Sequence, residues 1–248
     1  MQKQFIPKRK DRQSAPLSFA QQRLWFLDQL EPNSPRYNVS RALRLRGELD
    51  LKVLQQALDA IVNRHETLRS NFRDVDGVPI LVIRPSVKTP VTFVDLSDQP
   101  IDCREDTLIA TLNELVLRPY NLSTDAMLRA SLVRLNQHDH VLLLVLPHIT
   151  SDGWSMVILC QELMALYDSL LHGQPCPLPD LPIQYADYAV WQREWLQGNV
   201  LDIQLSYWGR RLAEVSDLNL PTDRGRPALP PIGRGLDQTP MDPAGKDS

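Results

Sequence analysis

A histidine and an aspartate lie close together at a junction between two predicted elements. Residues 147–155 read Pro-His-Ile-Thr-Ser-Asp-Gly-Trp-Ser, between an apolar run at 141–146 and a helical pattern at 154–171. Histidine is the side chain best suited to accept a proton near neutral pH, and the start of a helix presents N–H dipoles that favour negative charge. We interpret His148 as a candidate general base, with Asp152 placed to orient a partner or to pair with an arginine. The alternative is that His148 only ends a strand and Asp152 only caps the helix.

A second polar cluster lies at residues 64–69, which read Arg-His-Glu-Thr-Leu-Arg. It follows the apolar stripe of a predicted helix at 50–63, so its arginines could reach and neutralise the Asp152 loop. The alternative is that Arg64 and His65 only complement the negative C-terminal end of that helix. Aromatic side chains at helical spacing within 185–195 are interpreted as core packing rather than as ligand contacts.

Composition and missing motifs exclude several classes of function. The chain has 27 basic and 30 acidic residues and a net charge of -3, without the basic excess typical of nucleic-acid-binding domains. It has no GxSxG serine motif and no CxxC pair for zinc, and its glycines are too dispersed for a phosphate-binding loop. Three cysteines are too few for a disulfide framework, and the longest strongly apolar stretch is too short to span a membrane. We therefore predict a cytoplasmic protein without a metal site, a membrane contact or a nucleic-acid partner.

Hydrophobic periodicity predicts helices and strands in a layered order. Helices are predicted at residues 18–30, 50–63, 104–117, 154–171 and 185–195, with Gly173 as the left-handed cap after the fourth. Strands are predicted at 67–72, 78–83 and 91–94, followed by a hairpin of 127–135 and 140–146. This order predicts an α/β fold, or an α+β two-layer sandwich, with a mixed β-sheet flanked by helices. Polar residues 1–16 predict a disordered tail, 17–215 a globular lobe, and the proline- and glycine-rich 216–248 a linker.

Several segments taken together resemble a known family. They are residues 17–27 (LSFAQQRLWFL), 64–69 with Phe72, 148–155, 185–191 (YADYAVW) and 220–224 (LPTDR). In this order they are similar to the core motifs of condensation domains from nonribosomal peptide synthetases, a branch of the chloramphenicol acetyltransferase-like superfamily. The resemblance covers residues 16–227.

The resemblance implies amide-bond formation between two thioesters. In the family, donor and acceptor carrier proteins present an acyl or peptidyl thioester and an aminoacyl thioester on 4′-phosphopantetheine arms. The amine attacks the thioester carbonyl inside a tunnel that both arms enter. By this resemblance His148 positions or deprotonates the amine, while Asp152 is structural and pairs with Arg64. Because the arms belong to the carrier proteins, no cofactor bound covalently to this chain is expected.

The resemblance also assigns roles to the neighbours of this histidine. Gly153 lets the backbone approach the substrate closely, and Trp154 and Ser155 support the site. Pro147 departs from the family, which usually has the first of two neighbouring histidines there, as a support of the loop, and His148 corresponds to the second. Since proline removes a backbone N–H and fixes φ, we expect an altered loop at this position.

The family's fold is a pseudo-dimer of two similar lobes, with the tunnel between them. The resemblance places 17–215 in the N-terminal lobe and 216–248 in the inter-lobe linker and the start of the second lobe. We therefore expect this chain to supply one wall of the tunnel. Its parent activity is then condensation, and the alternative is a catalytically inactive remnant or a carrier-protein-binding module. A third alternative is a split enzyme completed by another polypeptide or by self-association.

Overall fold

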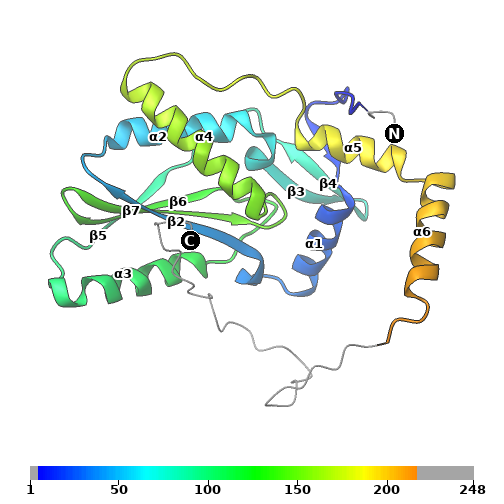
Figure 1. The fold of residues 1–248 in the computed structure, drawn as a ribbon, viewed down its shortest axis with the longest axis horizontal. Coiled ribbons are helices and arrows are strands. Elements are labelled where there is room, and N and C mark those ends of the chain that lie inside the picture. Colours follow the sequence, from blue (N-terminus) through cyan, green and yellow to red (C-terminus); the bar gives the residue numbers. More distant parts are fainter. Residues whose placement is uncertain (1–4, 217–248) are drawn as a thin grey trace, which may run out of the picture. The chain divides into compact units, whose positions relative to one another are not determined.

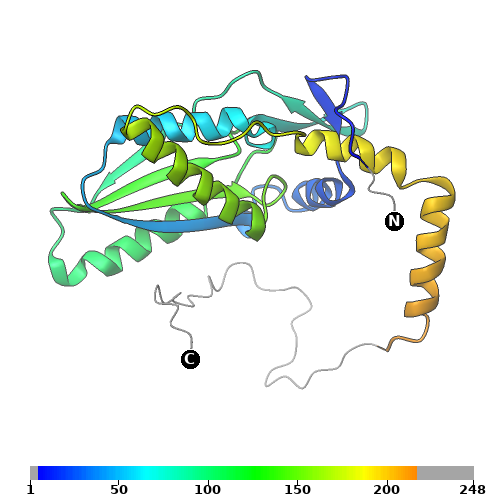
Figure 2. The same cartoon turned by 45° about the horizontal axis from the view of Figure 1, so that its top comes forward.

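The computed structural model describes residues 5–216 of the 248-residue chain. In chain order its elements are β1 (Ser14–Pro16), α1 (Phe19–Leu30), the 3-10 helix η1 (Pro35–Tyr37), β2 (Asn38–Arg46), α2 (Leu51–Arg64), the 3-10 helix η2 (Glu66–Arg69), β3 (Ser70–Val75), β4 (Val78–Ile83), β5 (Val91–Asp95), α3 (Ile101–Val116), β6 (Arg129–Asn136), β7 (Asp139–Pro147), α4 (Gly153–Leu171), α5 (Tyr185–Trp195) and α6 (Gly198–Leu212). The strands form two sheets with helices packed against them (Figure 1; Figure 2). This confirms the predicted α/β class. The predicted linker lies outside the described residues except for Ser216.

The larger sheet holds β7 between two partners. Its strand order is β2-β7-β6-β5, with β7 antiparallel to both neighbours and β5 parallel to β6, so the sheet is mixed. β6 and β7 form the predicted hairpin, in which Asn136 pairs with Asp139. Every residue of β7 from His140 to Pro147 is buried. A strand covered on both faces is what its unbroken apolar run predicts.

Helices cover both faces of this sheet (Figure 1). Leu142, Leu144 and Leu146 of β7 face the core shared with α2 and α4, whereas the alternate residues Leu143 and Val145 face a core that includes the end of α3. This alternation follows from the two-residue period of a strand. The sheet therefore fixes the direction in which β7 delivers the chain to the predicted site.

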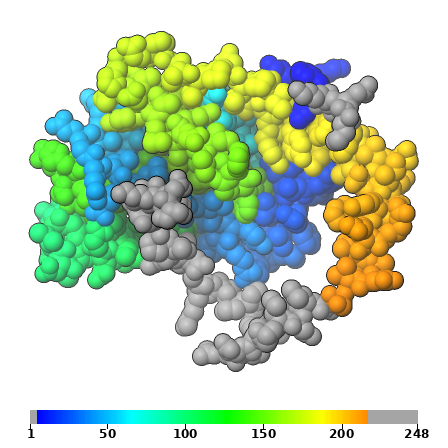
Figure 3. Space-filling view, viewed as in Figure 1, coloured from blue at the N-terminus to red at the C-terminus, as the bar shows by residue number. Residues whose placement is uncertain are grey.

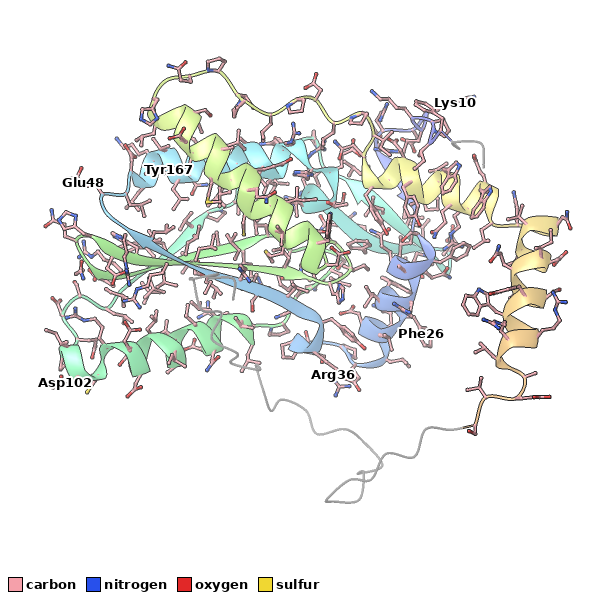
Figure 4. The ribbon with its side chains drawn as sticks, viewed as in Figure 1. Lys10, Phe26, Arg36, Glu48, Asp102 and Tyr167 are labelled. Atoms are coloured by element: carbon pink, nitrogen blue, oxygen red, sulfur yellow. The ribbon has the colours of Figure 1, made fainter. Side chains whose placement is uncertain are left out.

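Local sequence explains the position of α2. The carboxylate of Asp50 accepts hydrogen bonds from the N–H groups of Lys52 and Val53, which caps the helix. Its predicted apolar stripe is buried, as Leu54, Ala57, Leu58, Ile61 and Val62. The backbone N–H of Asp50 also donates to the hydroxyl of Tyr167 on α4 at 2.9 Å, and Figure 4 shows Tyr167 beside the start of α2. The two helices that pack on this face are thus tied at one end.

α4 runs from the predicted site to the protein surface. Figure 3 shows the helix in yellow-green on the face turned to the viewer. Its exposed side chains include Trp154, Val157 and Met164. The helix ends at Leu171, and Gly173 takes a φ of 63°. Glycine adopts this left-handed conformation without strain, as predicted for the cap. Among residues 5–216, no helix has both the length and the apolar content that crossing a membrane requires.

The smaller sheet corrects the prediction of a disordered N-terminal tail. Its order is β1-β4-β3, and β1 belongs to the segment that was predicted to be disordered. Arg9 is buried, with its guanidinium 2.6 Å from Glu66 and 2.8 Å from Asp187. The prediction is therefore wrong for residues 9–16, and residues 1–4 lie outside the described range. Local composition could not reveal this order, because the partners of Arg9 lie 57 and 178 residues away along the chain.

Two further elements were not predicted from the sequence. β2 is an edge strand of the larger sheet, and its exposed side chains include Arg41, Arg44 and Arg46. These arginines interrupt the apolar pattern by which a strand is recognised. α6 follows α5 after Leu196 and Gln197, and none of its residues is buried.

Candidate functional site

The segment from Pro147 to Asp152 forms a tight turn between β7 and α4. The backbone N–H of Thr150 donates to the carbonyl of Pro147 at 3.0 Å, and the Thr150 hydroxyl donates to the same carbonyl at 2.9 Å. The N–H of Ser151 donates to the carbonyl of His148 at 3.3 Å. These contacts fix the turn internally, so the chain reverses from the strand into the helix within a few residues.

The imidazole of His148 is held by this turn. Its Nδ1 lies 2.7 Å from the carbonyl oxygen of Ser151. A carbonyl oxygen can only accept a hydrogen bond, so Nδ1 carries the proton. In the neutral ring Nε2 then has a free lone pair, and it has no hydrogen-bond partner among the described residues. The ring is exposed and borders a pocket. This geometry gives His148 a proton-accepting nitrogen at an open surface.

Pro147 is compatible with a hydrogen-bonded turn. The N–H of His148 donates to the carbonyl of Tyr37 in the strand-end pairing with β2, at 2.8 Å. Backbone groups of successive residues in an antiparallel pair point to opposite sides, so the N–H position of residue 147 points away from β2. On that side the neighbouring strand is β6, whose first residue, Arg129, pairs with Val145, so β6 does not extend as far as position 147. Proline therefore removes no ladder hydrogen bond there.

Asp152 caps α4. Its carboxylate accepts hydrogen bonds from the hydroxyl of Ser155 at 2.6 Å and from the N–H of Ser155 at 2.7 Å. These two hydrogen bonds hold the pKa of Asp152 below its usual range, and the one from the hydroxyl has the larger effect. Partial burial opposes them by raising the pKa. The alternative that Asp152 acts as a helix cap is thus the one that the structure shows, and Ser155 is its partner.

The predicted pairing of Asp152 with Arg64 is wrong. The Arg64 side chain lies 3.2 Å from the carboxylate of Glu162 and donates to the carbonyl of Pro179 at 2.7 Å. His65 Nε2 contacts the same Glu162 carboxylate at 2.6 Å. Glu162 lies ten residues beyond Asp152 in α4, about 15 Å along the helix. Both basic residues at the end of α2 therefore pair across the packed helices, and neither alternative given by the sequence named Glu162 as the partner.

The two residues after Asp152 occupy open positions. A Cβ atom added to Gly153 would meet nothing within 4 Å, so the space above this residue is free for an approaching group. The Trp154 side chain is 79% exposed. Its predicted role in supporting the site therefore finds no packing basis in the structure.

Two pockets flank the turn that carries His148. One, of about 360 Å³, is lined by His148, Tyr37 and residues of α1 that include Gln21 and Leu24. The other, of about 200 Å³, has mainly apolar walls, and its lining includes His65, Leu68, Leu146, Met156 and Leu159. Both pockets share Thr150, Ser151, Ser155 and Tyr185. The turn is therefore the wall between them. Within the described range, no group of three or more histidine, cysteine or acidic residues could hold a metal ion.

Sequence reasoning missed the contacts that join α1 to the turn. The Gln21 side chain is buried and donates to the carbonyl of Ile149, next to His148, at 3.3 Å. Gln21 and Ser18 form a capping box at the start of α1, and the Ser18 hydroxyl lies 3.0 Å from the hydroxyl of Tyr185. The spacing Ser-x-x-Gln was the signal that could have revealed this cap. The side chain of Tyr185, interpreted from the sequence as core, is instead 40% exposed at both pockets.

Comparison with known proteins identifies the family. A family model for the condensation domain matches residues 11–232. The chain belongs to the condensation-domain family. One of the linear gramicidin synthase subunits from Brevibacillus parabrevis is 46% identical over 215 residues, which are 86% of this chain and 3% of that protein. Bassianolide nonribosomal cyclodepsipeptide synthetase from Beauveria bassiana is 41% identical over 215 residues, 86% of this chain and 7% of that protein.

Solved structures of the condensation-domain fold agree with this assignment. The X-domain from teicoplanin biosynthesis, in its complex with OxyB, superposes with a TM-score of 0.81 at 29% identity, covering 93% of this chain and 50% of that chain. The starter condensation domain of rhizomide synthetase gives a TM-score of 0.74 at 22% identity, covering 82% of this chain and 49% of that chain. The resemblance stated from the sequence is confirmed. This chain spans about half the length of these solved structures and a small part of the synthetases.

Proposed function

We propose that this chain carries the proton-accepting wall of a condensation site, where an amine attacks an acyl or peptidyl thioester to form an amide. The observation that supports this most directly is the His148 ring, with its proton on Nδ1 and its Nε2 free beside a pocket of about 360 Å³. The relatives that share this sequence are synthetases of peptides and cyclodepsipeptides. We infer that the substrates arrive as thioesters on the 4′-phosphopantetheine arms of donor and acceptor carrier proteins.

The chemistry requires few groups from the protein. The amine nitrogen attacks the thioester carbonyl, a C–N bond forms and the C–S bond breaks. The proton lost by the amine passes to Nε2 of His148, and the departing thiolate takes a proton to become a free thiol. General base catalysis of this kind contributes about 10²- to 10⁴-fold. Asp152 contributes indirectly, because its cap fixes the start of α4 and hence the end of the turn.

The alternative of a catalytically inactive remnant is not favoured. It rested partly on Pro147, which was expected to alter the loop. The turn nevertheless keeps the Nδ1 hydrogen bond of His148 and the contact of its N–H with Tyr37. The geometry that the proposed reaction needs is therefore compatible with proline at position 147.

The test is amide formation between an acyl thioester on a donor carrier protein and an aminoacyl thioester on an acceptor carrier protein. The product on the acceptor is measured by mass spectrometry. One arm contains the chain alone, and a second arm adds the remaining half of a related condensation domain, since solved relatives are about twice as long. We expect product in the second arm, and a loss of about 10²-fold or more in His148→Ala. His172→Ala, at the exposed far end of α4, is the matched control and should keep the wild-type rate. Transfer that does not depend on His148 in either arm would contradict the proposal.

A further inference from the structure

Ser151 lies on the wall between the two pockets, and its hydroxyl is unused. Its backbone is committed, because its carbonyl accepts from His148 Nδ1 at 2.7 Å and its N–H donates to the His148 carbonyl at 3.3 Å. The residue is 8% exposed, and its Oγ has no hydrogen-bond partner within residues 5–216. A buried hydroxyl without a partner lowers stability, so its presence beside the reactive histidine needs an explanation.

The neighbouring hydroxyls of the same turn do have partners. Thr150 donates to the carbonyl of Pro147 at 2.9 Å, and Ser155 donates to the carboxylate of Asp152 at 2.6 Å. Those contacts fix the turn and cap the helix. The Ser151 hydroxyl fixes neither, so the shape of the turn does not depend on it.

Both pockets that Ser151 borders have polar groups in their walls. His148 lines the larger one, and the Nε2 atom of its ring can accept a proton or a hydrogen bond. Thr150, Ser155 and Tyr185 line both pockets, and their hydroxyls have partners in Pro147, Asp152 and Ser18. Among the hydroxyls shared by the two pockets, that of Ser151 is therefore the one left to donate to a substrate group, with His148 as the acceptor.

The position of the hydroxyl favours donation to an oxygen atom. The N-terminal end of α4 is already capped by the carboxylate of Asp152, which cannot donate a hydrogen bond, whereas the Ser151 hydroxyl can. A serine hydroxyl moves between staggered positions by rotation about Cα–Cβ, so it can reach an entering group without a backbone movement. A carbonyl oxygen that gains negative charge during attack is the group that such a donor stabilises best.

We propose that the Ser151 hydroxyl donates a hydrogen bond to the carbonyl oxygen of the acyl thioester bound beside His148. This rests on the proposed function, since it names the substrate group that the same site recognises. Two residues of the turn then contact the reacting groups. Nε2 of His148 receives the proton of the amine, and Oγ of Ser151 donates a hydrogen bond to the oxygen of the carbonyl.

The test compares two small probes on the 248-residue chain. One is S-hexanoyl-N-acetylcysteamine, and the other is the thioether in which a methylene replaces the carbonyl. Calorimetric titration should show that wild type binds the thioester about fivefold more tightly, the contribution of one neutral hydrogen bond. Ser151→Ala should abolish this preference, keep the affinity for the thioether, and keep or raise the melting temperature.

Ser169→Ala is the matched control. Ser169 is also a buried serine, 7% exposed, but it lies near the C-terminal end of α4, away from both pockets, and its hydroxyl donates to the carbonyl of Leu166 at 3.0 Å. Its removal should lower the melting temperature and leave the preference for the thioester unchanged. The two serines thus separate loss of a structural hydrogen bond from loss of a substrate contact.

Three results would overturn the inference. They are a wild-type chain that does not distinguish the probes, an equal preference in wild type and Ser151→Ala, and a melting temperature in Ser151→Ala that falls as far as in Ser169→Ala. Failure of the proposed function is seen separately, in the transfer assay with His148→Ala. Probe discrimination that depends on Ser151, with transfer that does not depend on His148, would support the carbonyl contact and refute the condensation mechanism.

Discussion

The guanidinium of Arg9 lies 2.8 Å from the carboxylate of Asp187, although 178 residues separate the two in the chain. Both side chains are almost fully buried, at 2% and 1% exposure. The same guanidinium lies 2.6 Å from Glu66 in η2. One cation therefore fastens the N-terminal segment to α5 and to the segment that follows α2. These two elements also supply Tyr185 and Leu68 to the pocket walls.

Arg9→Met should lower the free energy of unfolding by about 3–5 kcal/mol, because it removes the buried cation that makes the shortest contacts with two buried carboxylates. Urea denaturation followed by circular dichroism measures the change. Arg12→Met is the control, since Arg12 lies 3.6 Å from the same Asp187 carboxylate but is 50% exposed. An exposed ion pair of this kind contributes about 0–1 kcal/mol. Similar losses in the two variants would contradict the buried role of Arg9.

Stability should fall in acid through Asp187. Burial raises the pKa of this carboxyl. Hydrogen bonds from Gln184 and Arg9 and the charge of Arg9 lower it by more than burial raises it, so the pKa of Asp187 lies below its usual range. A carboxyl with a lowered folded pKa adds stability above its unfolded value of about 3.9, and this stability is lost as the pH falls through the folded pKa. We expect the free energy of unfolding to decrease below about pH 5.

The measurement for this prediction is urea unfolding at a series of pH values. Asp187→Asn should be less stable than wild type at neutral pH, and its stability should change less with pH in the acid range. An acid slope that is the same in both proteins would show that other groups are responsible.

Double-mutant cycles can test whether Arg64 interacts with Glu162, as the structure shows, or with Asp152, as the sequence predicted. We expect a coupling energy of about 1–3 kcal/mol for Arg64→Ala with Glu162→Gln, because their charges are in contact and mostly buried. The coupling of Arg64→Ala with Asp152→Asn should lie within about 0.5 kcal/mol of zero. Unfolding in urea gives both values. A large second coupling would restore the pairing that the sequence predicted.

Predictions from the sequence were correct for features that depend only on residues close together in the chain. The apolar stripe of α2 and the run that forms β7 follow from periodicity alone. The partners of charged side chains did not follow, because they are set by packing: Arg64 faces Glu162 only once α2 lies on α4. The burial of Arg9 is the same kind of case, since a basic residue in a polar segment shows no sign of a carboxylate 178 residues away.

The site itself was predicted in part. The position of His148 at the end of a buried strand followed from the sequence, and so did a cap at Asp152. The state of the imidazole did not, because it depends on which backbone carbonyl the turn brings to Nδ1. The unused hydroxyl of Ser151 also required the structure, since only the contacts of Thr150 and Ser155 show that those neighbouring hydroxyls are committed.

The tautomer of His148 is directly measurable. The 2.7 Å contact between Nδ1 and the Ser151 carbonyl predicts that the neutral ring carries its proton on Nδ1. The ¹⁵N chemical shifts of the neutral imidazole distinguish the two nitrogens. His148→Ala identifies the resonances, and the exposed His138, whose ring has no hydrogen-bond partner among residues 5–216, gives a reference ring. A protonated Nε2 with a bare Nδ1 would show that the turn does not hold the ring as described.

Pro147→Ala should leave the site intact while slightly destabilising the fold. Position 147 points its backbone nitrogen away from β2 and beyond the end of β6, so an added N–H gains no ladder partner. Alanine loosens the unfolded chain, and we expect a loss of about 0.4–1 kcal/mol for that reason. The ¹⁵N shifts of His148 should stay at their wild-type values, because its contacts to Tyr37 and Ser151 involve other backbone groups. A shift of the proton to Nε2 in this variant would mean that the fixed φ of proline, and not the hydrogen bonds of the turn, aims the imidazole.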